Sequence, residues 1–242
     1  MEPLPIALMI LLSFAAATLQ GITGFGFAVL LMGFFPILIG VRTANVLVSL
    51  VGTAVVLYLF VPLRRFVVRK HLLPVLVGTA VGIPLGVLLL VRLDERVITV
   101  SLGVFLIAYL LFELFVRERL QAHPPRWLGY VAGLLGGSFG GAFTSGGPPI
   151  VAYLSSLDLE KTAAKATILA LIAIASLYKV ALLLAYQLVT VEVLRYAAVV
   201  LIPAFLGTLV GVRLFRRFSA RVFRRIVQGL LLVTALTLIL KG

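Results

Sequence analysis

Two glycine-rich stretches interrupt long apolar runs, and their residue types suit the binding of a small anion. GGSFGGAFTSGGPPI (136–150) holds six glycines and two adjacent prolines, and QGITGFGF (20–27) is the second stretch. Backbone leaves helical pairing inside a membrane only where protein or water satisfies it, so each break indicates a cavity. Glycine permits φ > 0 and lets NH groups approach a ligand, while Pro148 and Pro149 suit the first turn of an outgoing helix. Two such helix starts facing each other would form a pocket rich in donors, which suits an oxyanion.

Hydroxyl groups beside the glycines would add side-chain donors to this pocket. The predicted substrate-binding residues of the two breaks are Thr23, Gly24, Phe25, Gly26, Gly140, Gly141, Thr144, Ser145, Gly146 and Gly147. The competing interpretation is close helix packing, because small residues let backbones approach. That interpretation fits Gly78, Gly82 and Gly86, at four-residue spacing, and the pair Gly207 and Gly211. For the two breaks we favour a site, because Thr and Ser lie beside the glycines.

A lysine lies deep within another apolar run. Lys179 is near the middle of 163–188, where a lysine costs about 2.5–3.5 kcal/mol, so it should face a cavity or a partner. We predict that it binds the substrate or takes part in proton coupling; a structural ion pair and snorkelling to the interface are the alternatives. Glu113, towards one end of 97–116, is a second candidate for proton coupling, although such residues are more often interfacial.

Composition places these residues in a membrane. The chain has 242 residues, of which 62% are apolar and 12% charged, and its mean hydropathy is +1.23. In soluble domains roughly a quarter of the residues are charged, about twice the fraction in this chain. It has no cysteine and two histidines, both in charged linkers, so we predict no metal, no cofactor, no catalytic residues and no enzyme activity. No glycine precedes a lysine, which excludes a P-loop, and we assign the net charge of +13 to loops facing lipid rather than to nucleic-acid binding.

The apolar runs predict an all-α polytopic protein. They are 5–40, 44–62, 72–91, 97–116, 127–157, 163–188, 193–212 and 222–240. Six are near the ~20 residues that cross a bilayer once, and the other two contain the glycine breaks. The first run lacks a basic start and a cleavage site, so we expect a membrane segment rather than a cleaved signal.

The two halves of the chain resemble each other. LGVLLLVRL (85–93) matches LGTLVGVRL (206–214), and RTAN (42–45) resembles KTAA (161–164). We therefore predict two repeats, 1–121 and 122–242, each a broken segment followed by three helices. Internal repeats with breaks at matching positions are typical of transporters, whose binding site lies at the repeat interface.

Charge distribution indicates how the broken segments cross the membrane. If each crosses once, the Lys and Arg residues outside the membrane divide nine against eleven. If each is a hairpin that enters and leaves on one side, they divide fifteen against five, which the positive-inside rule prefers. The hairpin arrangement gives each half three crossings, so the repeats are inverted and both termini lie outside. A single kinked membrane span over 5–40 is the alternative for the first segment, because each of its two arms is long enough to cross most of the membrane.

The glycine-rich break in each half, the proline after it and the G-x-L-x-x-x-R-L that closes the third segment resemble the sulfite exporter TauE/SafE family of bacterial anion permeases. The resemblance covers essentially the whole chain. It implies export of sulfite, sulfonates or similar anions across the inner membrane. It points at Gly24, Gly26, Gly140, Gly141, Gly146, Gly147 and Pro148.

Three functions remain open at the level of sequence. The favoured one is a secondary transporter that exports a small sulfur-containing anion by alternating access. The second is an uptake carrier or channel for another anion or ion, although few interior carboxylates are available for a cation. The third is a membrane subunit without transport activity. The expected partners are the anionic substrate and the lipid bilayer, and we also consider a homodimer.

Overall fold

The described part of the chain is entirely helical. The computed structural model describes residues 3–112, 124–214, 232 and 235–239. Residues of the first half form α1 (Pro3–Thr23), α2 (Phe27–Ile39), α3 (Val41–Phe60), the short 3₁₀ helix η1 (Val61–Phe66), α4 (Arg69–Arg92) and α5 (Glu95–Leu111). Those of the second half form α6 (Trp127–Phe143), α7 (Gly147–Ser155), α8 (Lys161–Ala185) and α9 (Val191–Leu214). Most of the predicted segment 222–240 lies outside the described residues.

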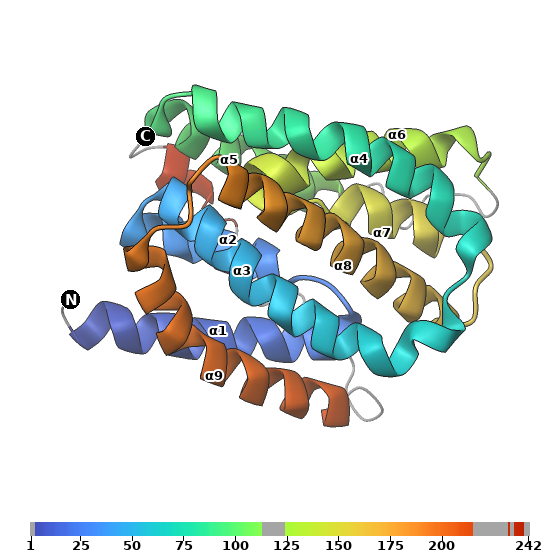
Figure 1. The fold of residues 1–242 in the computed structure, drawn as a ribbon, viewed down its shortest axis with the longest axis horizontal. Helices are drawn as coiled ribbons and strands as arrows, with labels where there is room; N and C mark the ends of the chain where they lie inside the picture. Colours follow the sequence, from blue (N-terminus) through green and yellow to red (C-terminus); the bar gives the residue numbers. More distant parts are fainter. Residues whose placement is uncertain (1–2, 113–123, 215–231, 233–234, 240–242) are drawn as a thin grey trace.

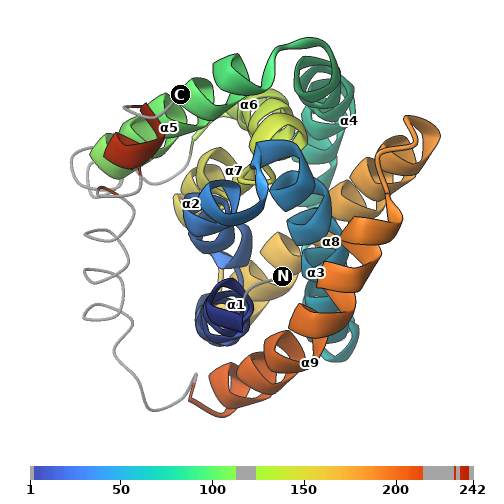
Figure 2. The ribbon, with the colours of Figure 1, turned by 90° about the vertical axis from the view of Figure 1, so that its left-hand side faces the viewer.

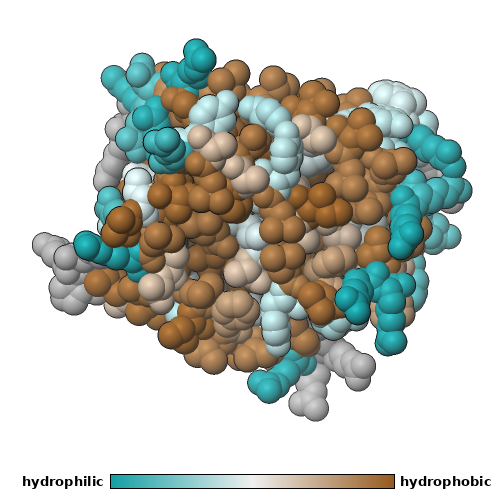
Figure 3. Space-filling model, in the orientation of Figure 1, coloured by the Kyte–Doolittle hydropathy of each residue, from teal (hydrophilic) through white to brown (hydrophobic). Residues whose placement is uncertain are grey.

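Five of the helical segments are long and apolar enough to cross a membrane. They are Leu4–Thr23, Val41–Phe66, Arg69–Arg92, Lys161–Ala185 and Val191–Leu214. Figure 3 shows a broad hydrophobic surface on one face of the molecule, with hydrophilic residues gathered at its two ends. These helices and this surface fit the predicted all-α multi-pass membrane protein.

Each of the two apolar runs that contain a glycine break, 5–40 and 127–157, forms two helices joined by a short non-helical segment. The first break separates α1 from α2 at residues 24–26, and the second separates α6 from α7 at 144–146. In Figure 1, α1 begins at the left of the bundle and α2 returns to the left, whereas α6 begins at the right and α7 returns to the right. The two hairpins therefore open towards opposite ends of the bundle. An inverted relation between the complete halves stays a prediction.

The largest helix interfaces join the first half of the chain to the second. They are those of α4 with α6 and of α1 with α9. Figures 1 and 2 show these two pairs on opposite sides of the bundle, with α3 and α8 running between them. The first arm of each hairpin thus packs on the third long segment of the other half.

Glycines bring these paired helices together. A β-carbon at Gly78, Gly82 or Gly86 of α4 would overlap the main-chain carbonyls of Tyr130, Leu134 or Ser138 of α6, respectively. In the other pair, β-carbons at Gly207 and Gly211 of α9 would overlap the carbonyls of Phe14 and Thr18 of α1. Thr18 also donates a hydrogen bond of 3.1 Å to the Gly207 carbonyl across this interface. The packing role predicted for these five glycines is confirmed.

Single cysteines in this cysteine-free chain can test the sidedness of the bundle. Asp94 and Glu160 are exposed residues in loops at opposite ends of the bundle. We expect an impermeant maleimide added to intact cells to label Asp94→Cys and not Glu160→Cys, because the basic loops should face the cytoplasm. A permeant maleimide should label both variants. Labelling of Glu160→Cys alone from outside would reverse the predicted orientation.

Candidate functional site

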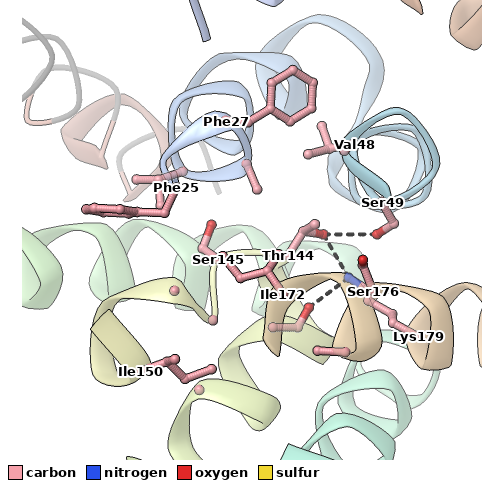
Figure 4. Close-up of a pocket in the computed structure, with 18 of the residues that line it drawn as sticks. Phe25, Phe27, Val48, Ser49, Thr144, Ser145, Ile150, Ile172, Ser176 and Lys179 are labelled. Carbon is pink, nitrogen blue, oxygen red and sulfur yellow. Dashed lines mark hydrogen bonds between the residues drawn. The ribbon is translucent and has the colours of Figure 1, made fainter. Parts of the chain in front are cut away.

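A cavity lies where the two breaks meet. It measures about 100 Å³ and is lined from α1, α2, α3, α4, α6, α7 and α8. Apolar side chains make up much of its wall, including Phe25, Phe27, Val48, Ile150 and Ile172, as Figure 4 shows. Both breaks contribute to the same wall, so residues more than one hundred positions apart in the sequence enclose one space.

In the first break, two glycines adopt positive φ angles and the last residue of α1 makes hydrogen bonds that stabilise the turn. Gly24 has φ +86° and Gly26 has φ +105°, which side-chain-bearing residues rarely adopt. The Thr23 hydroxyl lies 2.5 Å from the Phe25 carbonyl and 2.9 Å from the Leu19 carbonyl. These contacts close the turn without help from a ligand.

The second break reaches its turn by a different route. Here the residue in the left-handed conformation is Thr144, with φ +58°, and none of the six nearby glycines has a positive φ. The expectation that glycine supplies φ > 0 in this break is therefore wrong. Gly136, Gly141 and Gly146 are instead close-packed: added β-carbons would meet the Gly146, Ile83 and Gly136 carbonyls. Glycine is required here because backbones touch.

Lys179 connects the second break to the helices around it. Its ammonium group lies 2.8 Å from Asn45 Oδ1, 2.8 Å from the Gly140 carbonyl and 2.7 Å from Thr144 Oγ1. The residue is 3% exposed and points from α8 towards the break, as Figure 4 shows. An ammonium group has three protons, so this set of acceptors matches its capacity. The Gly140 carbonyl belongs to the last turn of α6, where a cation also offsets the helix dipole.

Asn45 extends this cluster to α3. Its amide nitrogen donates to the Ala142 carbonyl at 2.6 Å, while its Oδ1 accepts from Lys179. The Ser49 hydroxyl lies 2.7 Å from the Asn45 carbonyl and 3.3 Å from Thr144 Oγ1. The end of α6 is thus joined by polar contacts to one helix from each half of the chain.

The two helix starts at the cavity are unequal in donors. At the start of α2, Phe27 NH donates to Gln20 Oε1 at 3.3 Å. Ala28 and Val29 also line the cavity, and their NH groups belong to the first turn, which has no acceptor within the helix. At the start of α7, Pro148 and Pro149 carry no NH group. The sequence predicted NH donors at both helix starts. In the structure the start of α2 has more backbone NH donors than the start of α7.

Eight of the eleven residues predicted to bind substrate line the cavity. They are Phe25, Gly26, Gly140, Thr144, Ser145, Gly146, Gly147 and Lys179. Thr23, Gly24 and Gly141 do not line it, because Thr23 closes its own turn, Gly24 lies against the Lys165 side chain and Gly141 packs on α4. We leave these three out of the proposed site. Glu113 lies outside the described residues.

Several lining residues were absent from the sequence prediction. Ser49 and Thr53 line the cavity, and with Asn45 they recur every fourth residue along one face of α3. This polar stripe within an apolar span is a signal that the sequence does contain. The described residues hold no group of three His, Cys, Asp or Glu side chains that could bind a metal ion.

A helical bundle that spans the membrane, with two broken helices and a buried lysine around one interior cavity, has the architecture of a membrane transporter. The sequence pattern of the family described as Sulfite exporter TauE/SafE matches residues 9–238. The chain belongs to this family, and membership implies a membrane transporter of sulfur-containing anions. Comparisons with curated proteins and with solved structures gave no match.

The glycines of α6 and of the second break should separate into two classes on substitution. Added β-carbons at Gly140 and Gly147 would find their nearest neighbours at 3.6 and 3.8 Å, so alanine fits and only narrows the cavity. Gly140→Ala and Gly147→Ala should keep their melting temperature and lose transport rate. Gly133→Ala and Gly146→Ala should lose about 1–3 kcal/mol or more of stability through backbone overlap. Thermal unfolding in detergent distinguishes the classes, and equal destabilisation of all four variants would contradict this division.

The contact between Lys179 and Asn45 should appear as a coupling energy. Lys179→Met leaves buried acceptors unpaired and should cost about 1–3 kcal/mol. In the double variant with Asn45→Leu, the total loss should be smaller than the sum by about 0.5–3 kcal/mol, because the two residues share one contact. Chemical or thermal unfolding of the four proteins measures this difference. Additive losses would mean that the contact contributes nothing to stability.

Proposed function

We propose that this protein is a secondary transporter that exports a small sulfur-containing anion, such as sulfite or an organosulfonate, across the bacterial inner membrane by alternating access. The observation that carries the proposal is the shared cavity of the two breaks, with Lys179 in its wall. A broken helix costs backbone hydrogen bonds, and a cavity that binds a substrate gives a reason for that cost.

The charges around the cavity favour an anion over a cation. Lys179 is the single ionisable side chain among the described residues that line the cavity, and none of those residues is an Asp or Glu. The first turn of α2 adds NH groups and a positive dipole end. A hard cation would need several oxygen ligands, and most lining hydroxyls already contact main-chain carbonyls. One positive charge within a largely apolar wall suits a monovalent anion.

The arrangement of the hairpins supports alternating access. They open towards opposite ends of the bundle and meet at the cavity. Rocking the α1–α9 pair against the α4–α6 pair would expose the cavity to each side in turn and leave both close helix pairs intact. An inside-negative membrane potential favours anion export by about 2.3 kcal/mol per charge for each 100 mV.

Flux measurements in proteoliposomes test the substrate and the mechanism together. Vesicles loaded with radiolabelled sulfite should release it faster than protein-free vesicles, and an inside-negative potential set by valinomycin should accelerate the release. Unlabelled sulfite or methanesulfonate outside should stimulate exchange, because a carrier reorients faster with substrate bound, while acetate should not. Release without exchange stimulation would indicate a channel, and release equal to that of empty vesicles would refute the proposed function.

Removal of the cavity charge should weaken substrate binding. Lys179→Met should raise the half-saturation constant for sulfite by about tenfold or more, because a charge-assisted contact is lost. Lys165→Met is the matched control: Lys165 is on the same helix and donates to the Gly21 carbonyl at 2.7 Å, but it does not line the cavity. Its half-saturation constant should stay close to that of the wild type. Equal effects of the two substitutions would remove Lys179 from the binding site.

A further inference from the structure

Thr79 differs from most of the other threonines in the helices. Six others contact the carbonyl four residues earlier, namely Thr18, Thr23, Thr53, Thr99, Thr167 and Thr208. The Thr79 hydroxyl, in the middle of α4, has no hydrogen-bond partner among the described residues, although the residue is only 2% exposed. The carbonyl it would reach, that of Val75, lies against Gly133 of α6 at the close helix crossing. A buried polar group with no partner in the protein is uncommon and calls for a physical reason.

Thr79 also lines the cavity of the two breaks. The other hydroxyls in the wall lie within hydrogen-bond distance of main-chain carbonyls. These contacts are Ser49 to Asn45, Thr53 to Ser49, Thr144 to Asn45, Ser145 to Phe143 and Ser176 to Ala173. The three protons of Lys179 are matched by three oxygen atoms. Among the lining hydroxyls, that of Thr79 is the one with no partner in the described protein.

We propose that the Thr79 hydroxyl donates a hydrogen bond to an oxygen atom of the anion bound in this cavity, an inference that rests on the proposed function. Threonine in a helix has two accessible χ1 rotamers, so rotation about its Cα–Cβ bond can redirect the hydroxyl without moving the helix. A donor without a partner gives up no protein contact when a ligand arrives. A hydrogen bond to a charged oxygen is among the stronger kinds, so Thr79 would contribute to affinity directly.

Thr79→Val tests this inference because valine has nearly the same shape and lacks the hydroxyl. Thr79→Ser keeps the hydroxyl and removes a methyl group. Ser13→Ala is the matched control: Ser13 in α1 is also fully buried with an unpartnered hydroxyl, but it does not line the cavity. The measurements are the melting temperature in detergent, the half-saturation constant for sulfite release from proteoliposomes, and the melting-temperature shift that sulfite or methanesulfonate produces.

Thr79→Val should raise the half-saturation constant by about tenfold or more and abolish most of the anion-induced melting shift. Without anion its melting temperature should equal or exceed that of the wild type, because no internal hydrogen bond is lost. Thr79→Ser should retain most of the wild-type affinity. Ser13→Ala should gain stability in the same way and bind anions as the wild type does.

The transport measurement and the melting measurements together separate this inference from the proposed function. If the wild type releases sulfite and Thr79→Val does so with an unchanged half-saturation constant, the inference is overturned and the proposed function stands. If Thr79→Val and Thr79→Ser both melt well below the wild type without anion, the hydroxyl is structural and the inference is equally overturned. If the wild type transports nothing but shows a melting shift that depends on Thr79, the inference stands and transport fails. If the wild type neither releases sulfite nor shows a melting shift with the anion, both are overturned.

Discussion

A positive charge buried in a bilayer has to be compensated, and much of the interior of this protein follows from that requirement. Lys179 is compensated by oxygen atoms from a side chain of α3, from the last turn of α6 and from the residue in the second break. Thr144 takes a left-handed conformation that costs of order 1–3 kcal/mol in a non-glycine residue, and its hydroxyl meets the ammonium group there. The lysine therefore holds the break and the neighbouring helices in one arrangement. An arriving anion would offer the same cation a stronger partner than neutral oxygen atoms do.

The close helix crossings give this cluster its position. At the interface of α4 with α6 the backbones touch, so α6 has little freedom to shift along or rotate against α4. In contrast, α7 and α2 are short and carry the ends of the breaks. The fold thus combines tightly fixed long helices with short ones whose starts border the cavity. Main-chain contact is insensitive to side-chain rotamers, so these crossings hold the long helices around the cavity in a fixed arrangement.

The sequence predicts the helices and the location of both breaks well, because apolar length and clustered glycine report local constraints. It also predicts that Gly78, Gly82 and Gly86 pack against a neighbour, since their four-residue spacing puts them on one helix face. It does not distinguish Gly146 from Gly147, because the difference is whether another backbone lies beside the α-carbon. Nor does it reveal that Thr144 adopts the left-handed conformation in the second break, since glycine adopts that conformation at lower cost. The partner of Lys179 in α3 is 134 positions away, and local spacing carries no information about such a contact.

The exchange of partners between the halves bears on how such a chain could have arisen. The glycine face of α4 is covered by α6, and that of α9 is covered by α1, so neither half covers its own. A half-length ancestor would have exposed a strip of bare backbone to lipid. If the halves are inverted repeats, as the sequence predicts, two copies in opposite orientations would have covered each other's strips before they were joined in one chain. The same geometry makes the two halves interdependent during biosynthesis. The helix that packs on α1 is α9, which begins at Val191, so α1 is synthesised long before its partner.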